Sequence, residues 1–252
     1  MTLAPPVPER IQLCGPLVIE RAGERWESRL PGRQGRLLFA YLALHRHRSC
    51  SRQELAEAMW GDGAPAASDA GLNALISKLR KALGPELVDG RSSLRLRLGP
   101  DPFVDVEQAE LAVHRAESRV AQSDWQRAWG PSLAALFIAE RTFLPDDDAP
   151  WIDRQRDHMT AVRLRALEAY ASAALGTGGT ETLAAVRAGR QLVRLAPLRE
   201  SGYQVLMRAL AEQGNVAEAL QVHADLCALL REELGVSPSA LTQSVHRSLL
   251  RG

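Results

Sequence analysis

SDAGLNALISKLRKAL, residues 68–83, is the most informative segment of this sequence. Its large apolar side chains recur at helical spacing and fall within one narrow stripe, formed by Leu72, Leu75, Ile76, Leu79 and Leu83. The opposite side carries small, amide, hydroxyl and basic side chains, with Arg80 at its flank: Ala70, Asn73, Ala74, Ser77, Lys78 and Lys81. The pattern predicts a helix that is buried along its leucines and can approach a partner closely along its other side.

The segments next to this helix predict a helix-turn-helix with a β-hairpin wing. Ser51-Arg52-Gln53-Glu54 has the capping-box pattern that opens a short helix, and Gly61 closes that helix. After residue 83, Gly84-Pro85 stops the long helix, and two short strands are expected around Asp89-Gly90.

Further upstream the sequence predicts two strands and one more helix. The apolar, β-branched stretch 11–20 indicates a strand, Ala22-Gly23 a turn, and the alternating residues after it a second strand. RLLFAYLALH at 36–45 then has the apolar spacing of a helix. The N-terminal part is therefore expected to be an α+β winged helix.

The outward side of residues 68–83 has the chemistry of a DNA-binding helix. Asn and Ser can bind base edges or phosphates, Lys and Arg pair with phosphates, and a helix about 10–12 Å wide fits the major groove. Alternation in SLRLRL places Arg95 and Arg97 on one face of the wing. The candidate DNA-binding residues are Asn73, Ser77, Lys78, Arg80 and Lys81 on the helix, Arg91, Arg95 and Arg97 on the wing, and Arg33 and Arg36 near the first helix. The sequence leaves one alternative open, in which these residues form an ordinary surface exposed to solvent and do not bind DNA.

From about residue 104 the sequence has helical periods only. They are expected over 105–122, 124–141, 149–176, 180–195, 199–213, 215–234 and 238–250, with an interruption at Gly130-Pro131. Small and apolar residues between 167 and 230 recur 35 positions apart, which is typical of a helical repeat of the tetratricopeptide type. Two unrelated helix pairs are the alternative. Gly99-Pro100-Asp101-Pro102 is a natural hinge, so we expect a winged helix at 10–100 and an all-α repeat domain at 104–252 in a mainly α protein.

Composition supports a globular protein and excludes a disordered tail, a collagen-like repeat and a small disulfide-stabilised protein. Of 252 residues, 46% are hydrophobic and 24% are charged, which suffices for a real core. The net charge of +1 is uneven: residues 1–103 hold 15 basic and 11 acidic side chains. No signal peptide or membrane span is expected. We also expect no enzyme, no metal and no cofactor, because no nucleophile elbow, complete zinc ligand set or P-loop is present.

Four segments together resemble the Streptomyces antibiotic regulatory protein family. Two lie in the predicted winged helix, GRQGRLLFAYLALHRHRSCSRQELAEAMWGD at 32–62 and ALISKLRKALG at 74–84. Two more, FLPDDDAPWIDRQRDHM at 143–159 and LAPLRESGYQVLMRALAEQGNVAEALQVHADLCALLREELGVSPS at 195–239, resemble the bacterial transcriptional activator domain that follows it in that family. The wing departs from the family's Gly-Tyr-Arg core, having Ser93-Leu94-Arg95 instead.

The resemblance implies a sequence-specific transcriptional activator that binds direct repeats in double-stranded DNA near a promoter and recruits RNA polymerase, through sigma or another subunit. It also implies a homodimer at least on DNA, no membrane partner, and a location at the nucleoid in the bacterial cytoplasm. The alternative is an adaptor or ligand-sensing protein, in which the helical repeats carry the function and the winged helix mediates protein contacts.

Overall fold

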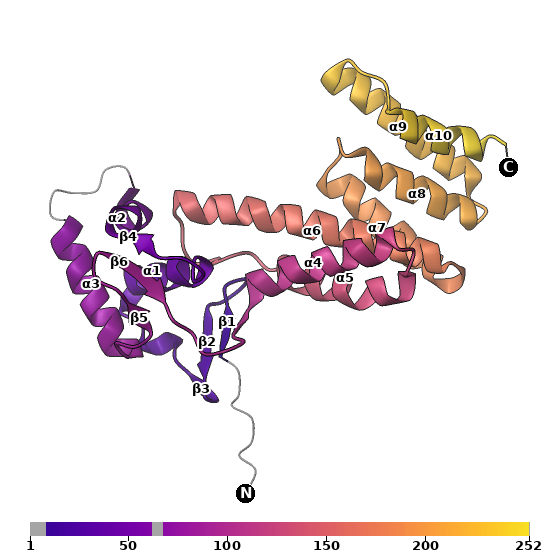
Figure 1. The fold of residues 1–252 in the computed structure, drawn as a ribbon. Coiled ribbons are helices and arrows are strands. Elements are labelled where there is room, and N and C mark those ends of the chain that lie inside the picture. Colours follow the sequence, from indigo (N-terminus) through magenta and orange to yellow (C-terminus); the bar gives the residue numbers. More distant parts are fainter. Residues whose placement is uncertain (1–8, 62–67, 252) are drawn as a thin grey trace, which may run out of the picture. The chain divides into compact units, whose positions relative to one another are not determined.

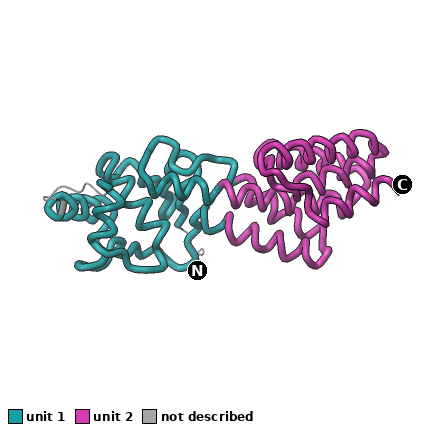
Figure 2. The backbone as a smooth tube through the Cα atoms, turned by 90° about the horizontal axis from the view of Figure 1, so that it is seen from above, with its two compact units in different colours: residues 1–108, 138–159 teal, residues 109–137, 160–252 magenta. Residues whose placement is uncertain are grey.

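The computed structural model describes residues 9–61 and 68–251. The chain forms two compact units (Figure 2). Unit 1 comprises Met1–Gln108 and Ile138–Met159, and unit 2 comprises Ala109–Phe137 and Thr160–Gly252. Each unit is therefore assembled from two separate stretches of the chain.

Unit 1 opens with a four-stranded sheet in the order β3-β2-β1-β7. Its strands are β1 (Arg10–Gln12), β2 (Val18–Arg21), β3 (Glu24–Arg25) and β7 (Phe103–Val104). β1 pairs antiparallel with β2 and parallel with β7, so Ile11 lies opposite both Ile19 and Val104. The expectation of a single strand over 11–20 was wrong, because Gly15, with φ of +90°, turns the chain between β1 and β2.

Unit 1 also contains a winged helix (Figure 1). It contains the short 3-10 helix η1 (Glu27–Arg29), the helices α1 (Gly32–Leu44), α2 (Arg52–Trp60) and α3 (Ser68–Leu83), and the strands β4 (Cys50–Ser51), β5 (Val88–Asp89) and β6 (Ser93–Leu96). The three strands form a sheet in the order β4-β6-β5, of which β5 and β6 are the expected hairpin. β4 was not expected.

The predicted helix signals in unit 1 are confirmed. The Ser51 hydroxyl accepts a hydrogen bond from the Glu54 backbone N–H at 3.1 Å, and the Glu54 carboxylate accepts one from the Ser51 N–H at 3.3 Å. This reciprocal pair satisfies two free donors at the start of α2. Gly61 follows the last turn of α2 with φ of +73°, a conformation that suits glycine.

Unit 2 is built of helices. They belong wholly or in part to α4 (Asp105–Ala121), α5 (Trp125–Ala139), α6 (Pro150–Thr177), η3 (Gly179–Glu181), α7 (Thr182–Leu195), α8 (Glu200–Glu212), α9 (Val216–Leu234) and α10 (Ala240–Leu249). Within the unit, α8 packs against α7, α9 and α10 through a core that includes Val186, Leu206, Met207 and Leu210. The predicted fold class, a winged helix followed by helical repeats in a mainly α protein, is confirmed.

Two features of the second half bear on the sequence-based expectations. Gly130-Pro131 does not interrupt a helix, because α5 runs through Pro131 and the preceding residue has no Cβ to clash with the proline ring. The division at 10–100 and 104–252 stays a prediction, and the compact units follow a different line, since 138–159 pack with unit 1. In the part of the chain that the structure describes, none of the helices combines the length and apolar character needed to cross a bilayer.

Candidate nucleic-acid interface

The outer face of α3 is the surface formed by Ala70, Asn73, Ala74, Ser77, Lys78 and Lys81. All six residues are exposed. The leucine stripe on the other side is buried, and Leu72 and Leu79 have no exposed surface at all. The amphipathic pattern therefore has the orientation that the sequence predicts. It leaves small and polar side chains at the surface, where a partner can approach the helix backbone closely.

Lys78 and Lys81 give this face its positive charge. Both lie in the second half of α3, and Lys81, in its last turn, also interacts favourably with the negative end of the helix dipole. Among the residues that the structure describes, neither lysine has an ion-pair partner. Both charges are thus available to an anionic partner without the loss of an internal contact.

Arg80 instead joins α3 to the wing. Its Nε donates to the Val88 carbonyl at 2.9 Å, and its Nη2 donates to the Gly90 carbonyl. These acceptors lie in β5 and in the turn of the hairpin, which adjoins α3 in Figure 1. Arg80 is half-buried and supports the hairpin with two of its nitrogens, so its expected phosphate contact stays a prediction.

The wing arginines differ in their surroundings. Leu94 and Leu96 are buried, so the alternation expected for β6 is confirmed. Arg95 is half-buried and its Nε donates to the Arg46 carbonyl at 2.9 Å. Arg97 forms an exposed ion pair with Asp89 at 2.6 Å, and its hydrogen bond lowers the pKa of that carboxyl. The remaining wing arginine, at position 91, has an exposed side chain.

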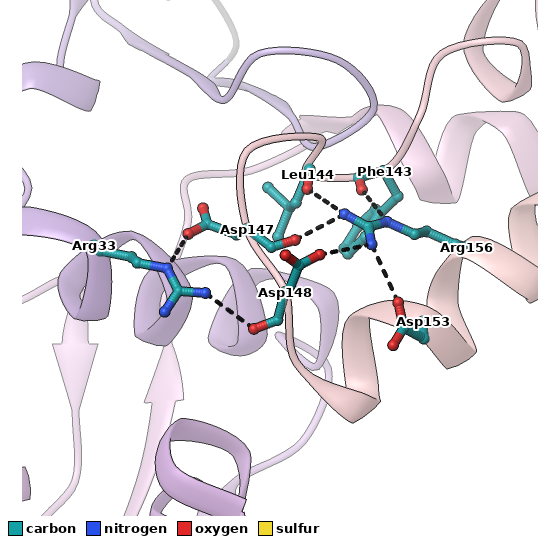
Figure 3. A network of polar contacts seen from close by, with 7 residues as sticks. All are labelled: Arg33, Phe143, Leu144, Asp147, Asp148, Asp153 and Arg156. Carbon is teal, nitrogen blue, oxygen red and sulfur yellow. Dashed lines mark hydrogen bonds and ion pairs between the residues drawn. The ribbon is translucent and has the colours of Figure 1, made fainter.

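Arg33 and Arg36 contact the loop at residues 144–148. Figure 3 shows Arg33 donating to the Asp147 carboxylate and to the Asp148 carbonyl, both at 3.0 Å. Arg36 lies 3.8 Å from the same Asp147 carboxylate. From the other side, Arg156 donates to the Asp147 carbonyl at 2.7 Å. The two arginines of α1 therefore hold the 144–148 loop within unit 1, and their expected phosphate contacts stay predictions.

One basic residue of this surface was missed by the sequence analysis. Arg52, the first residue of α2, donates through Nη2 to the Asn73 carboxamide oxygen at 2.9 Å and through Nη1 to the Arg91 carbonyl at 3.4 Å. Its Nε is 4.0 Å from Asp69. A cation at the N-terminus of a helix is unfavourable for the helix dipole. An arginine directly after the capping Ser51 is therefore the signal that could have pointed to this contact.

Comparisons with known proteins agree with this architecture. The family model of the bacterial transcriptional activator domain matches residues 104–250, and that of the C-terminal domain of transcriptional regulatory proteins matches residues 27–94. The solved structure of Mycobacterium tuberculosis EmbR in complex with a low affinity phosphopeptide superposes with a TM-score of 0.85. At 22% identity, with 96% of this chain and 65% of that chain covered, this likeness shows the same fold.

Two kinds of Streptomyces regulator are similar in sequence. Regulatory protein AfsR of Streptomyces griseus is 31% identical over 254 residues, which cover 96% of this chain and 24% of AfsR. Transcriptional regulator RedD of Streptomyces coelicolor is 30% identical over 250 residues, which cover 85% of this chain and 63% of RedD. The chain thus spans about a quarter of the length of AfsR. Its two matching domains and these relatives show that it belongs to the Streptomyces antibiotic regulatory protein family of transcriptional regulators.

Proposed function

We propose that this protein is a sequence-specific DNA-binding transcriptional activator whose outer face of α3 enters the major groove. The observation that carries the proposal is the exposed set of Asn73, Ser77, Lys78 and Lys81 above a fully buried leucine stripe. In a helix-turn-helix the second helix supplies the base contacts, while neighbouring elements contact the backbone. Here α3 is that second helix.

The proposed contacts fall into two classes. Asn73 and Ser77 contact base edges or the nearest phosphates, and Lys78 and Lys81 pair with phosphates. On the wing, Arg91 contacts the backbone or the minor groove. Further contacts with DNA are proposed for Arg95, Arg97, Arg33 and Arg36. Each of these side chains already has a partner within the chain, so a contact with DNA either adds to that interaction or replaces it.

The helical repeats serve as the protein-binding part of the proposed activator. Stacked helix pairs build extended surfaces that suit protein segments. We assign to unit 2 the contacts with RNA polymerase and with a second copy of the chain on DNA, and we assign direct repeats near a promoter as the binding site. The corresponding place of action is the nucleoid in the cytoplasm.

The test is the salt dependence of DNA binding after the two lysines are removed. Lys78→Ala with Lys81→Ala is expected to lower affinity and to reduce the slope of log affinity against log salt by about 1 to 2, because each lost phosphate contact contributes about 0.9. The probe is a duplex recovered by selection of bound genomic fragments with the unchanged chain. The matched control is Arg187→Ala with Arg194→Ala, which removes two exposed cations from α7.

The selection step also separates the activator from the adaptor or ligand sensor. Recovery of fragments that share a repeated motif supports the activator, and recovery of none supports the adaptor. An unchanged salt slope for the double lysine variant, at a site that the unchanged chain does bind, contradicts the placement of α3 in the groove.

A further inference from the structure

Arg52 lies where the two DNA-facing elements of unit 1 meet. It belongs to α2, yet its guanidinium is hydrogen-bonded to Asn73 on α3 and to the Arg91 backbone on the wing. Only 26% of its side chain is exposed. One planar group thus connects a residue proposed to read bases with the turn that carries a wing arginine. An exposed side chain that merely solubilises the surface has no such pair of contacts.

The chemistry of arginine fixes which end of the Asn73 carboxamide faces it. A guanidinium has donors and no acceptor, so the group it holds at 2.9 Å is the carboxamide oxygen. The Asn73 nitrogen, with two N–H donors, is then left at the exposed surface of α3. Within the described residues, this nitrogen has no acceptor. Asn73 is therefore held with its donors free.

We propose that Arg52 is a positioning residue for base recognition: it orients Asn73 so that the side chain donates to an acceptor edge in the major groove. Guanine is the base that fits, because its O6 and N7 are adjacent acceptors. Adenine recognition by Asn requires the carboxamide oxygen as acceptor for the N6 amino group. Arg52 uses one of the two lone pairs of that oxygen and places a positive charge where the N6 donor would approach, which disfavours adenine. This inference rests on the proposed DNA-binding function.

The contact with Arg91 gives Arg52 a second effect. Its two terminal nitrogens bind Asn73 and the Arg91 carbonyl at the same time, so one group contacts both the wing turn and Asn73. A lysine has the same charge but cannot present the planar fork. Arg52→Lys therefore separates the role of the geometry from that of the charge.

The experiment is selection of binding sites from a duplex pool with a randomised core, using the full chain and its variants. The unchanged chain is expected to enrich a site with a guanine whose preference is lost in Asn73→Ala. Arg52→Ala and Arg52→Lys are both expected to weaken the preference at that same position by roughly 5-fold or more. Combining Arg52→Ala with Asn73→Ala should add little, since both changes remove one interaction.

Two readouts distinguish positioning from other roles. A direct phosphate contact by Arg52 would lower affinity for all sequences alike and reduce the salt slope by about 0.9 in Arg52→Ala; that result overturns the inference. Additive effects of the two substitutions, or an Asn73-dependent adenine, overturn it as well. Thermal unfolding checks that each variant is folded, and if Arg52→Ala is not, Arg52→Lys decides.

A control variant tests whether the effect is specific to Arg52, and the result for the unchanged chain tells a failure of the proposed function from a failure of the inference. Arg127→Ala removes an exposed arginine that pairs with Asp124 in unit 2, and it should leave every base preference intact. If the unchanged chain enriches no site, the proposed function fails and the inference with it. If it does enrich a site, and the Arg52 variants keep the same base preferences, only the inference fails.

Discussion

Glu54 brings four donors to one carboxylate in unit 1. Besides the Ser51 N–H, it accepts the Tyr41 hydroxyl at 2.7 Å and both terminal nitrogens of Arg48, one of them at 2.9 Å. The hydrogen bonds from Arg48, and then that from Tyr41, lower the pKa of Glu54 from 4.5 to about 2. The ionised carboxylate thus connects α2, to which it belongs, with α1 and β4.

Glu54→Gln is expected to lower the free energy of unfolding at pH 7 by about 1 kcal/mol, because a partly exposed ion pair is weakened by solvent. Since the pKa is lower in the folded state, the unfolded state binds more protons below pH 4.5, and the advantage of the carboxylate is lost as the pH falls toward 2. Chemical denaturation between pH 7 and pH 3 measures the difference. Glu57→Gln is the control, and a difference that grows on acidification contradicts the assignment.

At this scale, a residue's role was predictable from sequence when its partner is close along the chain. Ser51 and Glu54 are three residues apart, so their mutual capping follows from spacing alone. Arg33 and Asp147 are 114 residues apart, and no local pattern connects them. Arg52 and Asn73 are separated by 21 residues and lie on two different helices, so their contact depends on how those helices pack.

The crossing of α7 and α8 depends on two glycines. A Cβ at Gly189 would lie 2.9 Å from the Leu206 Cβ and 3.1 Å from its Cα, and a Cβ at Gly202 would lie 2.9 Å from the Leu192 Cβ. The absence of a side chain lets the two helix backbones approach each other. The small residues expected at helix contacts of a repeat are thus present in this pair.

Gly189→Ala is expected to destabilise unit 2 by about 1–3 kcal/mol, since a well-packed core must shift to admit the methyl group. The matched control is Gly71→Ala in α3, where the nearest atoms, in the Trp60 ring, are 3.6 Å away and the added methyl meets ordinary contact. Alanine favours the helix there by about 0.5–1 kcal/mol. Thermal unfolding of both variants is the measurement, and an equal response of the two would count against close packing of α7 on α8.

The elements differ in how far sequence predicts them. The long helices were predicted to within a few residues, because each has several turns of apolar periodicity, and glycine or proline breaks such as Gly178-Gly179 and Ala196-Pro197 separate several of them. β4 and β7 have two residues each and no periodicity of their own. β7 forms only because it pairs with β1, more than 90 residues earlier in the chain, so its existence is decided by tertiary structure.

In the whole chain, segments that follow one another in sequence do not always belong to the same compact unit. Residues 138–159 follow two helices of the activator-domain match, yet they pack in unit 1. Within that unit the Trp151 ring lies edge-on to Tyr41, at a centroid distance of 5.2 Å, and its Nε1 donates to the Ala58 carbonyl at 3.1 Å. The sequence did not predict this packing. A hinge signal such as Gly99-Pro100 marks where one segment ends, but it does not tell whether a later segment, here 138–159, packs back against the first unit.

Trp151→Ala tests this division of the chain. Trp151 is 6% exposed, and removal of a buried tryptophan costs about 3–5 kcal/mol. Because it packs on α1 and α2, hydrogen exchange measured by mass spectrometry in the full chain should increase in those two helices and stay unchanged in α8 and α9. Trp125→Ala, in unit 2, is the counterpart and should leave α1 and α2 protected. If Trp151→Ala instead loosens only residues 104–252, the chain divides at its hinge, and the winged helix is stable without its second segment.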